Sequence, residues 1–156
     1  MVEGRMALFR AELSDQWREI GRLHGVVRER LGNFKESQEK VDSMGYKLHN
    51  LYCAYEELFE IVARYFENQV EPERYHADLL RRMKLNIPGV RPALISEETY
   101  ALLDELRRFR HFFRHAYGVD LDPERVEGVA KKAVELEDRF EGDLSNFLRL
   151  LGDDEQ

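Results

Sequence analysis

The amino-acid sequence predicts an all-α protein, built as an antiparallel bundle of four main helices with a short fifth helix. Two observations support this fold class. Apolar residues recur at steps of three and four along most of the 156 residues, which is the spacing of helices that bury one face. No stretch alternates apolar and polar residues for long enough to predict a strand. From the length we expect one domain, spanning residues 1–156.

The first predicted helix runs from about Val2 to Phe34 and carries one continuous apolar stripe. Its glycines weaken the pattern, because each costs about 1 kcal/mol relative to alanine in a helix interior. We therefore expect a break near Gly32 and Asn33. The stripe consists of Met6, Phe9, Leu13, Trp17, Ile20, Leu23, Val27, Leu31 and Phe34.

The second predicted helix, from about Glu39 to Val70, has the most regular pattern in the chain. Tyr52, Phe59 and Phe66 widen its apolar stripe. Such a helix packs on both neighbours or on a second subunit. The width of the stripe favours a core helix over a dedicated coiled coil, whose seam is narrower. The stripe consists of Val41, Met44, Leu48, Leu51, Tyr55, Leu58, Val62, Tyr65 and Gln69.

Three shorter segments follow. Glu73–Leu85 is predicted to be a helix with Pro72 in its first turn, a position that suits proline. Asn86–Pro92 is predicted to be a loop, because two prolines and a glycine within five residues cannot continue a helix. Ser96 is expected to cap the next helix, and Gly118 is expected to stop it.

The last predicted helix opens with a cap, a first-turn proline and an acidic residue, at Asp122, Pro123 and Glu124. Its apolar positions continue almost to the end of the sequence. They predict an inner face made of Val126, Val129, Ala133, Leu136, Phe140, Leu144, Phe147 and Leu151.

Composition limits the class of protein. The formal net charge is -7, which argues against a general DNA coat but leaves a local anion site possible. No apolar run approaches the roughly 18 residues of a membrane span, and Met1–Arg5 lacks the apolar segment of a signal peptide. The single cysteine, Cys53, excludes a disulfide framework and reads as a small core residue. We therefore expect a cytoplasmic protein without membrane contact.

One basic and aromatic segment stands out in this acidic chain. Residues 107–117 contain four arginines and two of the five histidines, at the end of a predicted helix. Such a segment predicts a localised site for a negatively charged ligand.

Other candidate sites are weaker. Glu73 and His76 have the Glu-x-x-His spacing of di-iron bundles, but that site needs a second copy, which is missing. His111 and His115 stand four apart, yet the sequence offers no third zinc ligand beside them. We therefore expect no metal and no cofactor.

The two remaining histidines, His24 and His49, are read as ordinary helix residues, and Cys53 shows no sign of a nucleophile.

The segment from Arg110 to Tyr117 resembles the Arg-x4-His-x-Tyr signature of HepT-like toxins in the HEPN superfamily. Here the motif is Arg110-His111-Phe112-Phe113-Arg114-His115-Ala116-Tyr117. Length and helix order are similar to that family along essentially the whole chain, and only these eight residues are specific. Many relatives have Asn after the arginine, where this chain has His111.

The resemblance implies a HEPN-like bundle and a metal-independent endoribonuclease that cleaves RNA at the cleft of a homodimer. It implies catalytic roles for Arg110 and His115, with His111 and Arg114 in support. The implied partner is a nucleotidyltransferase-like (MNT) antitoxin, which in that family adenylylates the tyrosine matched by Tyr117. Adenylylation would add bulk and negative charge beside the arginine and repel RNA.

These residue types suit RNA cleavage on physical grounds. The reaction needs a base for the 2'-hydroxyl, an acid for the leaving oxygen and cations for the phosphate. Histidine exchanges protons near neutrality, and arginine binds two phosphate oxygens in a fork. Five residues along a straight helix rotate a side chain by about 140°. Arg110 and His115 of one chain therefore do not face one point, which a cleft shared by two subunits would solve.

Three other interpretations remain open. In the first, the arginines form no site: Arg107, Arg108 and Arg114 are a solvated face, and His115 is a helix C-cap. In the second, the chain is a non-catalytic module that binds a nucleotide or RNA and is the partner of a nucleotidyltransferase. It would be a structural helical oligomer if the stripe from Val41 to Gln69 joined subunits.

Overall fold

The computed structural model describes residues 2–67, 75–116, 118 and 120–152, and these residues are all-α. The fold class predicted from the periodicity is confirmed. Four long helices and one short helix form an antiparallel bundle, with one additional turn of 3-10 helix. The elements are α1 (Val2–Arg30), η1 (Phe34–Glu36), α2 (Gln38–Phe66), α3 (Tyr75–Met83), α4 (Glu97–Arg114) and α5 (Pro123–Gly152).

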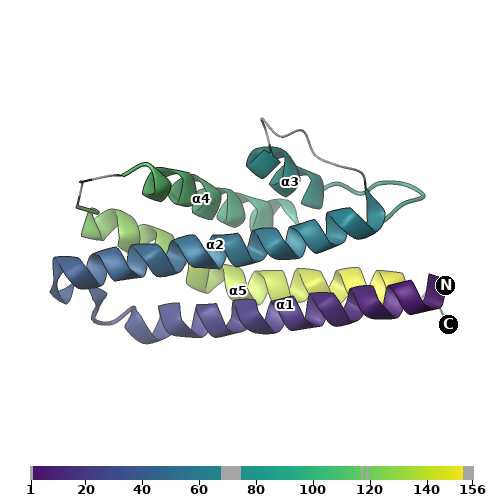
Figure 1. The fold of residues 1–156 in the computed structure, drawn as a ribbon, viewed down its shortest axis with the longest axis horizontal. Coiled ribbons are helices and arrows are strands. Elements are labelled where there is room, and N and C mark those ends of the chain that lie inside the picture. Colours follow the sequence, from purple (N-terminus) through teal and green to yellow (C-terminus); the bar gives the residue numbers. More distant parts are fainter. Residues whose placement is uncertain (1, 68–74, 117, 119, 153–156) are drawn as a thin grey trace.

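The three longest helices, α1, α2 and α5, run side by side along the length of the molecule (Figure 1). The shorter helices α3 and α4 both pack on α2, with α4 covering the end at which α2 begins (Figure 1). The first helix begins and the last helix ends at the opposite end. There Arg10 of α1 donates a hydrogen bond to the carbonyl of Leu148 in α5 (3.0 Å). The C-terminal end of α4 therefore lies far from the start of α1 and from the end of α5 (Figure 1).

Helix α2 is the centre of the core and contacts every other helix of the bundle. The apolar stripe predicted for it is buried inside the chain from Val41 to Val62, while Tyr65 is half-buried and Gln69 lies outside the described residues. This burial removes the basis for the structural oligomer, which needed the same residues at a subunit interface. The stripe buries Val41, Met44, Leu48, Leu51, Tyr55, Leu58 and Val62.

Helices α1 and α2 both end earlier than the sequence pattern predicted. Helix α1 ends at Arg30, and the break expected near Gly32 is a turn that leads into η1, where Phe34 is buried. Helix α2 ends at Phe66, because Glu67 takes an extended backbone conformation as its C-cap. After α1, the buried apolar residue Phe34 lies beyond the end of the helix. Apolar spacing therefore predicts where a helix ends only to within about one turn.

The segment between α3 and α4 is held by a buried arginine that the sequence analysis treated only as part of a loop. Arg91 donates to Glu67 (2.7 Å) and to the carbonyls of Arg82, Leu85 and Pro92. Its side chain is fully buried. The predicted loop is present, and both this side chain and backbone hydrogen bonds such as that from the Ile87 N–H to the Arg91 carbonyl hold it.

Helix α3 is shorter than predicted, at Tyr75–Met83 rather than Glu73–Leu85, and Pro72 and Glu73 lie outside the described residues. Across the part of the chain that is described, no helix is both long and apolar enough to cross a membrane.

Candidate functional site

The candidate site is built on the C-terminal half of α4. The predicted cap is confirmed, since the Ser96 hydroxyl accepts a hydrogen bond from the Thr99 N–H (3.1 Å). Glu97 and Glu98 follow in the first turn, where the helix dipole favours negative charge. His111 and Arg114 lie in the last turn, where it favours positive charge. The sequence thus places its cations at the end of the helix that stabilises them.

Helix α4 ends at Arg114 and not just before Gly118. The N–H groups of His115 and Ala116 bond to the carbonyls of Phe112 and Phe113, and this tighter turn closes the helix. Gly118 has a φ of 67°, a left-handed conformation that glycine adopts without strain. Glycine is therefore needed in the turn after the helix, and His115 itself is the C-cap.

Arg110 faces α2 and lies mostly under the surface of the bundle, with 9% of its area exposed. Its Nε donates to the Sγ of Cys53 on α2 (3.4 Å). Cys53, expected to be a core residue, is only half-buried and lies at the edge of the interface between the two helices. The predicted catalytic arginine is therefore oriented by α2.

His111 and His115 lie elsewhere on the same helix end. Both side chains are exposed, and their ring centroids are 4.6 Å apart. They contact each other because residues four apart share one face of a helix. Within one chain, the predicted catalytic pair is thus divided between two surfaces: Arg110 faces α2, and His115 packs beside His111 at the helix end. Tyr117 lies outside the described residues.

The arginines of α4 differ in their electrostatic partners. Arg107 and Arg108 both pair with Asp104, at 2.8 and 2.9 Å. No described carboxylate lies within ion-pair distance of Arg110 or Arg114. Asp104 thus partly neutralises Arg107 and Arg108, whereas no carboxylate among the described residues does so for Arg110 or Arg114.

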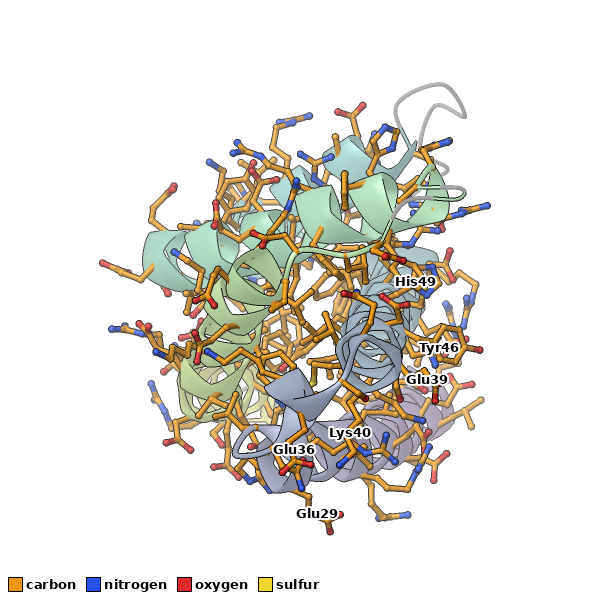
Figure 2. All side chains as sticks on the ribbon, turned by 90° about the vertical axis from the view of Figure 1, so that its left-hand side faces the viewer. Glu29, Glu36, Glu39, Lys40, Tyr46 and His49 are labelled. Atoms are coloured by element: carbon orange, nitrogen blue, oxygen red, sulfur yellow. The ribbon has the colours of Figure 1, made fainter. Side chains whose placement is uncertain are left out.

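Helix α2 adds a histidine to this surface. The His49 ring lies 5.3 Å from the Phe113 ring of α4 and 6.2 Å from the Tyr46 ring, which is nearly parallel to it. Figure 2, which looks onto this end of the bundle, shows Tyr46 and His49 on the same outer side of α2. The sequence analysis read His49 as an ordinary helix residue.

The pKa of His49 is lowered from its ordinary value, mainly by partial burial and also by the positive charges of Arg110 and Arg114. Its hydrogen bond with Asn50 acts in the opposite direction. The positive charge of the two arginines thus reaches the ring of His49, and the neutral imidazole is favoured beside them.

A buried phenol lies deeper in the same interface. The Tyr52 hydroxyl has no hydrogen-bond partner, and its pKa is raised well above its usual value by burial and by the charge of Glu56. Arg107 and Arg110 act on the same hydroxyl and lower its pKa in part. This tyrosine stays protonated at physiological pH.

No group of three or more histidine, cysteine or carboxylate side chains with the geometry of a metal site occurs within the described ranges. His76 pairs with Glu56 of α2, with 2.7 Å between Nδ1 and Oε2. Glu73, the other half of the Glu-x-x-His pattern, lies outside those ranges.

The fold and the site define a class: an all-α bundle of the HEPN type that carries an arginine and histidine motif at the end of a long helix. The model of the family described as HepT-like protein matches residues 43–151. No curated protein and no solved structure matches the chain. The matched segment covers more than half of the chain and includes the whole motif. The chain belongs to the HepT-like proteins of the HEPN superfamily.

Proposed function

We propose that this protein is a metal-independent endoribonuclease, the toxin of a HEPN/MNT toxin–antitoxin pair. The observation that carries the proposal is the family motif at the end of α4, where Arg110 and Arg114 lack a carboxylate partner among the described residues. An arginine without such a partner is available to bind a phosphodiester through two oxygens. The proposed substrate is RNA.

The proposed chemistry uses the motif residues. Arg110 binds the scissile phosphate and stabilises the charge that develops on it. His115 transfers a proton, and its exposure at the C-cap leaves the ring accessible to a substrate. His111 contacts His115 and supports its orientation, and Arg114 adds a second cation.

The proposal includes a homodimer in the cytoplasm. Because Arg110 and His115 of one chain face different surfaces, two chains that meet at their α4 ends would bring the arginine of one beside the histidine of the other. The proposed partner is a nucleotidyltransferase-like (MNT) antitoxin that adenylylates Tyr117. The added phosphate would compete with RNA for the arginines.

The test is incubation of the purified protein with mixed RNA in excess EDTA, beside the His115→Ala and Arg108→Ala variants. Arg108 is the matched control, because its side chain is 67% exposed and already pairs with Asp104. We expect cleavage by the wild type and by Arg108→Ala, and none by His115→Ala. Mass spectrometry of Tyr117 shows first that the preparation is unmodified. Equal cleavage by all three proteins would contradict the proposal.

A second candidate function is a non-catalytic module that binds RNA or a nucleotide as the partner of a nucleotidyltransferase. The separate orientations of Arg110 and His115 within one chain favour it, because a binding surface needs no alignment of the two. It predicts RNA binding that depends on Arg110, with no cleavage by unmodified wild-type protein.

A further inference from the structure

The surface beside Arg110 contains a histidine that the motif does not include. Cys53 Sγ is the common neighbour: it lies 3.4 Å from Arg110 Nε and 4.0 Å from His49 Nε2. One turn of α2 separates His49 from Cys53, so both side chains face α4. His49 and Arg110 therefore share one neighbour at the interface of α2 and α4, whereas His115 packs against His111.

We propose that His49 is the general base of the RNA cleavage reaction, acting beside Arg110 of the same chain. This proposal rests on the proposed function. It assigns the base to α2 and leaves His115 as the acid. The arginine and the base then share one surface of one chain, and His115 as the acid comes from the second chain of the proposed homodimer.

The hydrogen bonding of His49 favours one tautomer of its imidazole ring. Its Nδ1 lies 3.3 Å from the Oδ1 of Asn50, and an amide oxygen only accepts hydrogen bonds. Nδ1 therefore carries the hydrogen, and Nε2 keeps its lone pair. Nε2 is on the side of Cys53 and Arg110. Asn50 is thus a positioning residue that holds the tautomer a base requires.

The surroundings of His49 favour the neutral, proton-accepting form. The charged groups that act on it are Arg110 and Arg114 from α4, and from α2 it contacts Tyr46, Asn50 and Cys53. Together with partial burial, the two arginines lower the pKa of the imidazole. A bound phosphate would offset the arginine charges and raise this pKa again, so that proton uptake becomes easier once substrate is present.

The aromatic side chains beside His49 form a surface on which a nucleobase of the RNA can stack. Tyr46 is 52% exposed and lies nearly parallel to His49, and the Phe113 ring lies beyond it on α4. Exposed rings next to arginines stack the unpaired bases of single strands. A nucleotide whose base rests on Tyr46 has its ribose and phosphate near His49 and Arg110.

The proposed step is an internal transesterification. His49 Nε2 removes the proton of the 2'-hydroxyl, and the 2'-oxygen forms a bond to phosphorus as the bond from phosphorus to the 5'-oxygen breaks. The 5'-oxygen takes a proton from His115. The products are a 2',3'-cyclic phosphate and a 5'-hydroxyl, and no water, metal ion or redox partner is consumed.

The test compares the rates and pH profiles of wild type, His49→Gln, His49→Ala and His76→Gln. His76 is the matched control, because glutamine there still reaches Glu56 and the residue is outside the site. We expect His49→Gln to lose on the order of 100-fold or more in kcat/KM. We also expect it to lose the acidic limb of the profile. In the wild type, the apparent pKa of this acidic limb should lie below the pKa of free histidine, roughly 6.5. Imidazole added to His49→Ala should restore cleavage, which a structural role would not allow.

A second measurement does not depend on cleavage. RNA with 2'-O-methyl groups lacks the attacking hydroxyl, and NMR follows the His49 ring of wild-type protein as this RNA is added. We expect the ring signals to shift and the pKa of His49 to rise. Unchanged signals from His49 on saturation would overturn the proposal.

The outcomes separate the two proposals. Wild-type cleavage with an equal rate and pH profile for His49→Gln overturns the role of His49 and leaves the ribonuclease in place. No cleavage by unmodified wild-type protein overturns the ribonuclease, and the base role with it.

Discussion

Arg110 shows how one side chain acquires its role from a neighbouring helix. Arg110 is mostly buried on α4, with 9% of its area exposed. The contact that orients it, with Cys53, joins residues 57 positions apart. A guanidinium in such a setting binds a phosphate through a planar fork, which an ammonium group cannot reproduce.

We predict that Arg110→Lys lowers kcat/KM for RNA cleavage by at least about 10-fold, because lysine keeps the charge but loses the fork. Steady-state cleavage assays measure the loss, and Arg108→Lys is the control at an exposed position on the same helix. An unchanged kcat/KM in Arg110→Lys would show instead that charge alone matters at this surface.

His24 provides a prediction about stability and pH. It is 1% exposed, its Nε2 lies 2.6 Å from the Tyr55 hydroxyl, and burial lowers its pKa to about 3. In the unfolded chain, this histidine has an ordinary pKa and binds a proton below about pH 6.5. In the folded chain, it stays unprotonated at that pH. This contribution to stability is therefore complete above that pH and is lost as the pH falls toward 3.

We expect the free energy of unfolding to fall by on the order of a few kcal/mol between pH 6.5 and 4 from this group alone. Urea unfolding at a series of pH values measures it. His24→Gln should unfold at a lower urea concentration at pH 7. Its free energy of unfolding should also fall less steeply as the pH is lowered. The same slope in both proteins would mean that other groups cause the acid sensitivity.

At the scale of elements, the segment between α3 and α4 depends on one buried ion pair. Arg91 has no exposed side-chain area, and its partner Glu67 follows the last residue of α2. This arginine ties the end of α2 to the segment that leads into α4.

We predict that Arg91→Ala lowers the free energy of unfolding by about 3–5 kcal/mol, because Glu67 and three carbonyls lose their donor. Arg81→Ala is the control, since Arg81 of α3 is half exposed and its ion pair with Asp78 is long, at 3.8 Å. Chemical denaturation should show a change below about 1 kcal/mol for the control. Similar losses would contradict a special role for Arg91.

The packing of α2 against the segment after α4 requires a glycine. A Cβ on Gly45 would stand 2.4 Å from the Leu121 side chain and 3.4 Å from Phe113. Gly128 of α5 has open space at the same position. Leu121 is buried and must therefore move to admit even one methyl group at residue 45.

We predict opposite signs for the same substitution at these two sites. Gly128→Ala should stabilise by about 0.5–1 kcal/mol through helix propensity, and Gly45→Ala should destabilise by about 1–3 kcal/mol through overpacking. Thermal unfolding compares the two. A stabilised Gly45→Ala would show that Leu121 repacks without cost.

At the scale of the whole molecule, an acidic protein is proposed to bind an acidic polymer. The formal net charge is -7, and Arg107 and Arg108 share one carboxylate. Attraction of RNA then depends on Arg110 and Arg114. Few phosphates can be neutralised by so small a cationic surface.

The affinity for single-stranded RNA should therefore depend weakly on salt. With about 0.7 counterions released per phosphate contact, two arginines predict a slope of log K against log salt of about -1 to -2. Binding of 2'-O-methyl RNA between 50 and 200 mM KCl measures the slope, and Arg114→Gln should reduce it by about 0.7. A slope steeper than about -4 would indicate a broad basic surface instead.

The order of the helices, their buried faces and the family could all be predicted from the sequence. Ser96 was correctly predicted as a cap, and every residue predicted for the inner face of α5 is buried, because both signals are local. Ala130 is buried there as well and was not predicted. The ends of α1, α2 and α4 were placed less well, since helix ends depend on turns and caps that apolar spacing does not contain.

By itself, the sequence determined the all-α bundle, the HepT-like relationship and the position of the basic motif at a helix end. These follow from periodicity and from residues that are neighbours along the chain. Only the tertiary structure decided that Arg110 faces Cys53, that His49 lies on the same surface and that Arg91 is a buried anchor. Such contacts join residues far apart in the chain, and they depend on how the helices pack, which no spacing within one helix specifies.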